Sequence, residues 1–511
     1  MVDPQIREEI TKIHNEFQRD LPIVANSTLL KTRGLVKTPE RLKHNMGYLV
    51  NHLAYISDAS SCRQLFVETV WTLGTWPMRI GYSNEWFYLV DIAYHYAEED
   101  GLDDYKGRLT LLKSKTAFSD GQFDRSLEFV LNSIHQVLQQ QEPITLAQAL
   151  SHATTIYLYK EMPQKALLLI KDTESTHIID EKSAPLARLY LALAYLQIYR
   201  RIGELQKAQN LIKQIESHVL AQVDLRSAAV WYHNVGLTNR MIGKYDEAFH
   251  QHTKSREIFA ELHDDSEIGI IADIGLIFWE KGDLNQAIEN LSIALERAKK
   301  NLEYIRILKI ESHLMLAHLA KRNLRIANSL CESALKKANS IQYSSDIARI
   351  IGNRGILRIH LNDFEGAFED LSQYSESSIE NNRQLASVAN LARLQNIMGK
   401  TAEAISNAEK LLALAKRKKY LPIQIIALRL LAECSESKVA SPLLKEASTL
   451  SEGFRDFDHA ACLISLASLA QNDNDKDTYW KQGQQLLEKI DAGDWLREKT
   501  PNDPPLLPLL N

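Results

Sequence analysis

The chain of 511 residues contains few cysteines, and they form no motif. Cys62, Cys331, Cys434 and Cys462 lie too far apart for a CxxC pair or for the ligand spacing of a zinc site. Small secreted domains that depend on disulfides are much richer in cysteine. The pattern therefore favours four structural thiols in the core of a protein from a reducing compartment.

An excess of charge of one sign is also missing. The chain has 60 Lys and Arg residues against 65 Asp and Glu residues, which gives a net charge of −5. A chain so close to balance lacks the long-range field that favours nucleic acid or an anionic membrane surface as a partner. The composition therefore indicates neither partner.

Long apolar runs and a leader sequence are absent as well. The longest apolar run, residues 189–199, is too short to cross a bilayer. The first thirty residues contain Asp3, Glu8 and Glu9 where a signal peptide has a basic start and an apolar run. We therefore predict a cytoplasmic protein that is not embedded in a membrane.

Proline is missing from a long internal stretch. None occurs between Pro185 and Pro422. Because proline breaks helix interiors, its absence is typical of helices that follow one another through short turns. Those turns contain glycine or asparagine, which supplies the left-handed residue at a helix end: Gly203, Gly243, Gly282, Asn362 and Gly399.

Residues 268–298 show the repeated unit most clearly. Small residues stand at Gly275, Ala287 and Ala294, and large apolar residues such as Phe278 and Leu291 fill the positions between them. The periodicity is that of two amphipathic helices, with small residues where their backbones approach closely. The unit is therefore predicted to be a helical hairpin.

The same unit recurs along most of the chain. Positions equivalent to Ala287 lie 37 to 42 residues apart. Such a steady period is the signature of a repeat architecture. The positions are Trp86, Ser126, Ala166, Ala208, Ala248, Ala287, Ala327, Ala367 and Ala404.

This arrangement of small and bulky residues resembles the tetratricopeptide repeat. The resemblance implies an all-α, right-handed, superhelical solenoid of about eleven hairpins with a period near 40 residues. The segment 65–101, with Gly81, Glu85 and Trp86, also resembles the opening repeat of the sensor arms of STAND-class signalling ATPases. That second resemblance implies a regulatory arm separated from its motor.

Four regions are predicted. Residues 1–60 form a helical cap, with helices over 4–20 and from residue 39, joined by a connector at 22–37. Residues 61–420 form the repeat array, and 421–490 form degenerate helical repeats. Residues 491–511 form a tail rich in proline and leucine, and its apolar end, residues 500–511, is predicted to dock on the last repeat or in a groove.

The catalytic and nucleotide-binding motifs of this sequence are incomplete. Gly399-Lys400-Thr401 lacks the earlier glycine and the preceding strand of a phosphate-binding loop. His250 and His252 lie two apart on a helix, so they point to different faces and do not chelate a metal together. We therefore predict a protein that is not an enzyme and that has no cofactor and no metal.

A track of short polar residues follows the first helix of five consecutive units. In tetratricopeptide proteins, asparagine at this position contacts the backbone of an extended ligand, so the resemblance implies a binding groove here. The arginines among the flanking residues predict an acidic ligand nearby. The track is Asn234, Asp273, His313, Asn353 and Asn390, flanked by Arg200, Arg201, His233, Arg240 and Trp279.

The predicted function follows from this track. We predict a scaffold or adaptor that binds another protein or an extended peptide along the concave face of the solenoid. The alternative is a ligand-sensing regulatory arm of a STAND-type signalling, transcriptional or defence system.

Overall fold

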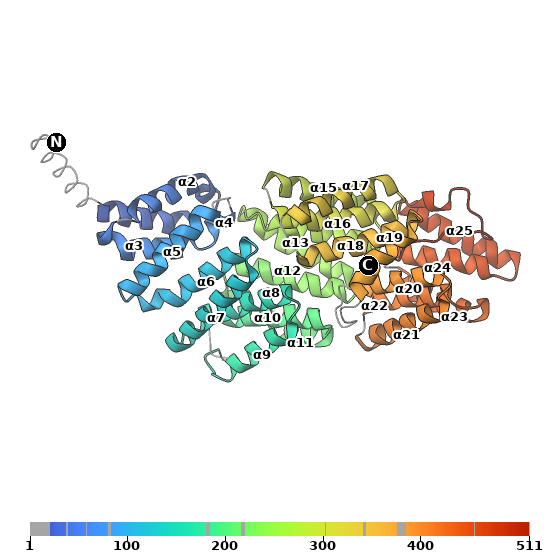
Figure 1. Ribbon diagram of the computed structural model, residues 1–511, viewed down its shortest axis with the longest axis horizontal. Coiled ribbons are helices and arrows are strands. Elements are labelled where there is room, and N and C mark those ends of the chain that lie inside the picture. Colours follow the sequence, from blue (N-terminus) through green and yellow to red (C-terminus); the bar gives the residue numbers. More distant parts are fainter. Residues whose placement is uncertain are drawn as a thin grey trace, which may run out of the picture. The chain divides into compact units, whose positions relative to one another are not determined.

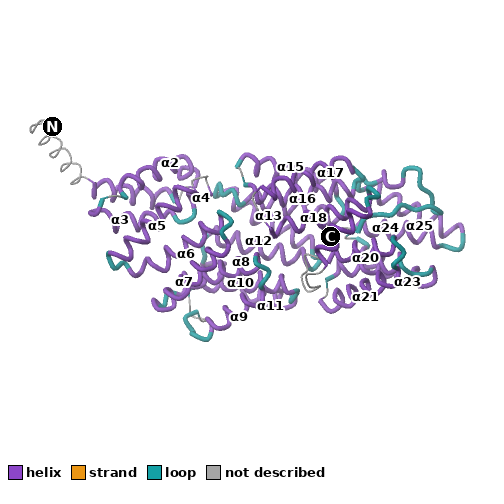
Figure 2. Tube along the Cα trace, in the orientation of Figure 1, coloured by secondary structure: helices purple, strands orange, loops and turns teal. Residues whose placement is uncertain are grey.

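The computed structural model describes most of the chain, and its regular structure is helical. The described ranges are 21–36, 39–57, 59–79, 83–179, 184–215, 220–301, 303–340, 344–375, 385–418, 420–453 and 455–509. Within them, helices follow one another through short turns, and the isolated bridge is between Thr500 and Asp503 (Figure 2). The all-α prediction is confirmed. The helix predicted over residues 4–20 lies outside these ranges.

The chain forms two compact units. Unit 1 comprises residues 1–198, 214–228 and 258–265, and unit 2 comprises 199–213, 229–257 and 266–511. No helix of the described ranges combines the length and apolar character needed to cross a membrane. Unit 1 contains α2 (Pro39–Ile56), α3 (Arg63–Leu73), α4 (Trp76–Arg79), α5 (Ser83–Glu99), α6 (Asp103–Ser119), α7 (Phe123–Gln140), α8 (Pro143–Tyr159) and α9 (Pro163–Glu174).

The remaining helices complete the array. Four of them have residues in both units: α10 (Pro185–Ile202), α11 (Leu205–Ile215), α12 (Leu225–Met241) and α13 (Tyr245–Glu261). Unit 2 continues with α14 (Glu267–Lys281), α15 (Leu284–Lys300), α16 (Tyr304–Ala320), α17 (Leu324–Ser340), α18 (Ser344–His360), α19 (Phe364–Ser375), α20 (Leu385–Ile397), α21 (Thr401–Lys418), α22 (Leu421–Glu433), α23 (Ser437–Ser451), α24 (Asp456–Leu469) and α25 (Asp473–Lys489). Figure 1 shows the order of these helices along the chain.

The start of unit 1 corrects one prediction. The connector predicted at residues 22–37 is wrong, because residues 21–35 are helical. Leu21, Ala25 and Leu29 recur every four residues, and all three are buried, the first two in the same core cluster as the apolar face of α2. The pattern consists of only three apolar residues with polar residues among them, so the sequence did not indicate a helix here.

Trp86 shows how unit 1 accommodates a large residue at a ladder position. The side chain is fully buried, and its indole Nε1 donates a hydrogen bond of 2.8 Å to the carbonyl oxygen of Gly74. Gly74 ends α3 with a φ of 55°, a conformation that favours glycine. The tryptophan therefore satisfies a carbonyl at a helix end while it fills the core.

The repeat register is confirmed by burial. The alanines at the predicted ladder positions from Ala166 to Ala404 are fully buried. In the reference unit, α14 and α15 are joined at Gly282, whose φ is 92°, and a Cβ on Gly275 would lie 3.3 Å from the carbonyl oxygen of Ala287. The two helices thus approach closely enough to require the small residues there. The fold is a solenoid of tetratricopeptide-like helical hairpins.

The even-numbered helices form the inner layer of unit 2. Each helix packs on its neighbours in sequence, and the even-numbered helices from α14 to α24 also touch one another in consecutive pairs. Among the described residues, the odd-numbered helices of unit 2 make no comparable contact with one another. A stack of hairpins in which one layer is closer together curves toward that layer. The even-numbered helices therefore lie on the concave side.

The last hairpin of unit 2 packs against much earlier ones. Phe457 of α24 and Leu487 of α25 share a hydrophobic core with Leu284, Ala317 and Ala327. A Cβ on Gly282, in the turn between α14 and α15, would lie 3.0 Å from the Cβ of Asp456. The hairpin of α14 and α15 and the hairpin of α24 and α25 are therefore in direct contact.

Candidate functional site

Polar side chains on the inner layer of unit 2 connect one even-numbered helix with the next. The sequence predicted that ten of these residues face a groove. The structure joins several of them to each other, and one of them to the C-terminal tail.

Arg200 and Asn234 contact each other. Arg200 Nη1 donates to the carbonyl oxygen of Asn234 at 2.9 Å, and Nη2 donates to its Oδ1 at 2.8 Å. Asn234 Nδ2 in turn donates to the carbonyl oxygen of Val230 at 2.8 Å. Burial lowers the pKa of Arg200 to about 10. The amide of Asn234 is thus occupied by the protein itself. Arg201, the next residue of α10, is half-buried.

His233 and Asp273 form a second pair between α12 and α14. The distance from His233 Nε2 to Asp273 Oδ2 is 2.7 Å. Burial alone would raise the pKa of Asp273, but the hydrogen bond and charge of His233 hold that pKa well below its usual range. Asp273 is therefore ionised at neutral pH.

Arg240 pairs with Glu280, again between α12 and α14. Arg240 Nη1 lies 2.5 Å from Glu280 Oε1. The carboxylate neutralises the guanidinium where an acidic ligand was predicted. Arg240 was one of the arginines from which an acidic ligand was predicted, and in the structure its charge is balanced by Glu280.

The next part of the track is also engaged within the protein. Asn353 Nδ2 donates to Ser312 Oγ at 2.8 Å, and His313 Nε2 lies 3.4 Å from Arg349 Nη1. Burial holds the pKa of His313 well below its usual value, so its ring is neutral. Trp279 is only 8% exposed and packs in the hydrophobic core.

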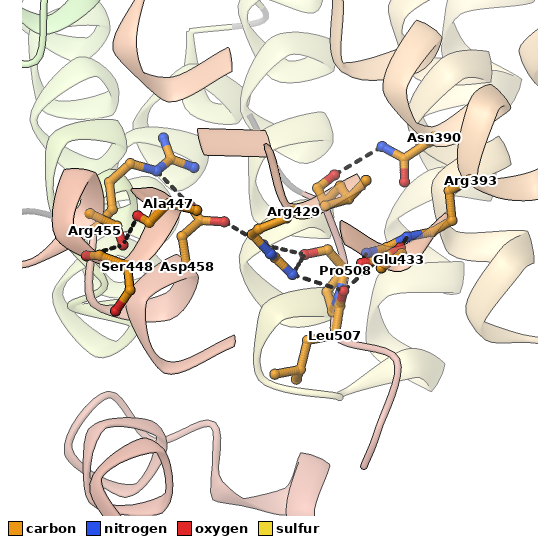
Figure 3. Close-up of polar contacts among 12 residues, drawn as sticks. Asn390, Arg393, Arg429, Glu433, Ala447, Ser448, Arg455, Asp458, Leu507 and Pro508 are labelled. Atoms are coloured by element: carbon orange, nitrogen blue, oxygen red, sulfur yellow. Dashed lines mark hydrogen bonds and ion pairs between the residues drawn. The ribbon is translucent and has the colours of Figure 1, made fainter. Parts of the chain in front are cut away.

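Asn390, the last residue of the predicted track, contacts an extended segment. Its Nδ2 donates a hydrogen bond of 2.9 Å to the carbonyl oxygen of Leu509 in the tail (Figure 3). One turn further along α20, Arg393 Nη1 donates to the carbonyl oxygen of Leu507 at 2.9 Å. Arg429 of α22 donates to the same oxygen at 3.2 Å and reaches that of Pro508 at 3.4 Å. Three side chains from two inner helices therefore hold the main chain of the tail.

Two tail leucines are buried beside these hydrogen bonds. Leu507 is 4% exposed and Leu509 is 0% exposed, whereas Leu506 is 40% exposed. Leu509 packs in a core cluster with Ala389 and Leu430. The docking predicted for residues 500–511 is confirmed for Leu507 and Leu509, whose main chain is held by α20 and α22 and not by the last hairpin. Residues 510 and 511 lie outside the described residues.

The two arginines that hold the tail are fixed by carboxylates. Arg393 pairs with Glu433 through two nitrogens, and Arg429 pairs with Asp458. Arg455 Nε donates to the other oxygen of Asp458 at 2.6 Å. Burial alone would raise the pKa of Asp458, but the two guanidinium groups hold it below its usual value. Figure 3 shows this chain of contacts leading from α24 to the tail.

The beginning of the tail is anchored separately. Trp495 Nε1 donates a hydrogen bond of 2.8 Å to the carbonyl oxygen of Ala320, at the end of α16. Its ring meets that of His360 edge to face, with the ring centroids 5.3 Å apart. The tail therefore contacts the ends of α16 and α18 as well as the middle of α20 and α22.

Four residues that hold the tail or fix its arginines were not predicted from the sequence: Arg393, Arg429, Glu433 and Asp458. A signal for one pair was present, because Arg393 and Glu433 lie 40 residues apart. His233 and Asp273, and Arg240 and Glu280, have the same separation. Residues of opposite charge that lie one repeat apart, each on the first helix of its hairpin, therefore indicate contacts between neighbouring inner helices.

Thiol chemistry is not favoured at the buried cysteines. All four are free and buried. Burial raises the pKa of Cys331 to about 11 and that of Cys462 to about 12. These two thiols are therefore protonated at neutral pH and poor nucleophiles.

No protein-family model and no curated protein matches the chain. Solved structures similar to it include NprR in complex with its cognate peptide NprX, at 16% identity and a TM-score of 0.48, over 70% of this chain and 99% of that one. A Rap protein complexed with Competence and Sporulation Factor has 14% identity and a TM-score of 0.47, over 71% and 98%. A STAND protein with a tetratricopeptide repeat sensor from Pyrococcus horikoshii has 16% identity and a TM-score of 0.38, over 74% and 53%. At these identities and scores, the function of this chain has to be inferred from its own residues.

Proposed function

We propose that unit 2 binds an extended apolar segment of a partner protein along α20 and α22, in the place taken by its own tail. The protein acts by this binding, as an adaptor or sensor without catalysis. One observation carries the proposal: Asn390, Arg393 and Arg429 donate hydrogen bonds to main-chain carbonyls of the tail. Carbonyl groups are present in any peptide, so the same donors suit a segment from another chain.

The selectivity of such a site comes from its apolar contacts. Leu507 and Leu509 are buried, and Pro508 between them restricts the backbone. A segment with proline beside large apolar residues is already close to an extended conformation, so it loses less entropy on binding. The preferred ligand is therefore a short segment with alternating leucine and proline.

The charges of the site indicate which ligand atoms are recognised. Arg393 is neutralised by Glu433, and Arg429 by Asp458. The remaining N–H groups are thus suited to a neutral carbonyl oxygen instead of a second carboxylate. The ligand binds through its internal backbone, and not through a free carboxyl terminus.

The test uses a chain that ends at Pro505 and a fluorescent peptide with the sequence of residues 500–511. The shortened chain is expected to bind this peptide, measured by fluorescence anisotropy. The full chain is expected to bind on the order of 100-fold more weakly, because a tethered tail competes at a millimolar effective concentration.

The matched control changes only the peptide. A peptide with Leu509→Asp is expected to lose binding, since that side chain is fully buried, whereas Leu506→Asp changes an exposed side chain and is expected to bind nearly as well. Equal binding by both peptides, or equal binding of the original peptide to the full and shortened chains, would contradict the proposal.

A further inference from the structure

His252 is buried without a hydrogen-bond partner. Its exposure is 0%, and neither of its ring nitrogens has a partner among the described residues. It takes the position that Leu291 has in the next repeat, and its ring lies against Gly236, where a Cβ would come within 2.8 Å of it. An unsatisfied buried polar group costs about 1 to 3 kcal/mol, so a histidine here needs an explanation that leucine would not.

Two further ligand-type side chains lie beside this ring. One ligand atom each from His233, His252 and Asp273 lies within 4.8 Å of the others. The three residues come from consecutive helices, α12, α13 and α14. Around a tetrahedral ion with bonds of about 2 Å, ligand atoms lie roughly 3.3 Å apart. The three side chains therefore converge to within small rotations of such an arrangement.

The protonation states of two of these residues suit a metal ion. Burial lowers the pKa of His252 to about 3, so its imidazole is neutral at pH 7. Asp273 is ionised, because contact with His233 outweighs the effect of burial on its pKa. Neutral imidazole and ionised carboxylate are the forms that bind metals.

We propose that His233, His252 and Asp273 bind one divalent transition-metal ion of the zinc class. Two imidazoles with one carboxylate are a recurrent zinc-binding set that leaves a fourth position open. The ion replaces the proton shared by His233 and Asp273 and gives His252 the partner that it lacks. The side chains of His233 and Asp273 are 28% and 20% exposed, so solvent reaches the site.

Two arginines lie near this site, and each is engaged elsewhere. Arg240 is paired with Glu280, which offsets its positive charge. Arg200 directs its guanidinium at the carbonyl oxygen of Asn234 and at Thr238. The repulsion that they exert on a dication is thereby reduced.

The experiment measures Zn²⁺ binding to the full chain by titration calorimetry, and Co²⁺ binding by visible absorption. Wild type is expected to bind one Zn²⁺ per chain and to give the intense visible bands of four-coordinate Co²⁺. His252→Leu installs the residue of the next repeat, so the fold is retained, and affinity should fall by at least about 100-fold. His250→Gln alters the exposed histidine two residues away and should bind the metal as wild type does.

Asp273→Asn provides a second variant, of nearly the same size, should His252→Leu fail to fold. It is expected to lose most of the Zn²⁺ affinity and the four-coordinate Co²⁺ spectrum. The proposal is overturned if wild type binds no stoichiometric Zn²⁺, or if a folded His252→Leu or Asp273→Asn chain binds it with unchanged affinity.

Discussion

Two stretches of the inner layer of unit 2 use similar residues but have different contacts. Along α12 and α14, His233 pairs with Asp273 and Arg240 pairs with Glu280. Along α20 and α22, Arg393 pairs with Glu433, and it also holds a carbonyl oxygen of the tail. The pairs at both places join residues one repeat apart. Only in the second stretch does one of these paired residues also donate to the main chain of the tail among the described residues.

The number of donors on arginine accounts for part of this difference. A guanidinium has five N–H donors, and a carboxylate that it meets with two nitrogens leaves several of them. Arg393 and Arg429 direct such remaining donors at the tail. A histidine that meets a carboxylate has at most one donor left. Ion pairs between repeats stabilise the array. The arginine N–H groups that these pairs leave unused form a site for the main chain of a bound segment.

The largest effect is expected from breaking the ion cluster behind the tail. Asp458→Asn removes the carboxylate between Arg429 and Arg455, whose side chains are 4% and 5% exposed. Two buried guanidinium groups would lose the carboxylate that they share, which costs about 3 to 5 kcal/mol. The free energy of unfolding, measured by urea denaturation, should fall by this amount. Limited proteolysis should also cut the tail faster, because Arg429 is no longer held in place.

The control for this variant is Asp456→Asn, two residues earlier. Asp456 pairs with Lys489, whose side chain is 68% exposed, so its loss should cost less than about 1 kcal/mol. Equal destabilisation by the two variants would mean that the cluster behind the tail is no more important than a surface pair.

The sequence predicted the hairpins and their register well, because both depend on short-range patterns. Small residues such as Gly275 and Ala287 recur at a fixed period, and burial of the ladder confirms it. The helix over residues 21–35 was missed because its apolar period is short. The contacts of Arg429 and Asn390 with the tail join residues that are 78 and 119 positions apart in the chain, and no local pattern encodes such contacts. The sequence did place Asn390 on the inner layer, since that required only the period.

An intermediate effect on the free energy of unfolding is expected from His252 when the pH falls. The measurement is urea denaturation with a chelator present. The folded pKa of His252 is about 3, below its ordinary value of 6.5, so the unfolded chain binds the proton more readily. The contribution of His252 to the free energy of unfolding is fully present above pH 6.5 and is lost as pH falls toward 3. At about 1.4 kcal/mol per pH unit, wild type should lose about 2 kcal/mol from this group between pH 6.5 and pH 5.

His252→Leu lacks this group, so its urea midpoint should change less over the same range. The charges that face the ring are those of Asp273, His233, Arg200 and Arg240, and each is retained in the variant. A midpoint that falls equally in both proteins would assign the acid sensitivity to another group.

The smallest effect is expected at two equivalent positions of the track, Asn353 on α18 and Asn390 on α20. Asn353 donates to Ser312 within the array, whereas Asn390 donates to the carbonyl oxygen of Leu509. Each alanine variant loses one hydrogen bond, worth about 1 kcal/mol. In the chain that ends at Pro505, Asn390→Ala should weaken binding of the peptide of residues 500–511 by five- to tenfold, at about 1.4 kcal/mol per factor of ten. Asn353→Ala should leave that affinity unchanged and lower only the melting temperature. If both variants weaken binding of the peptide equally, the ligand extends along α18 as well as along α20 and α22.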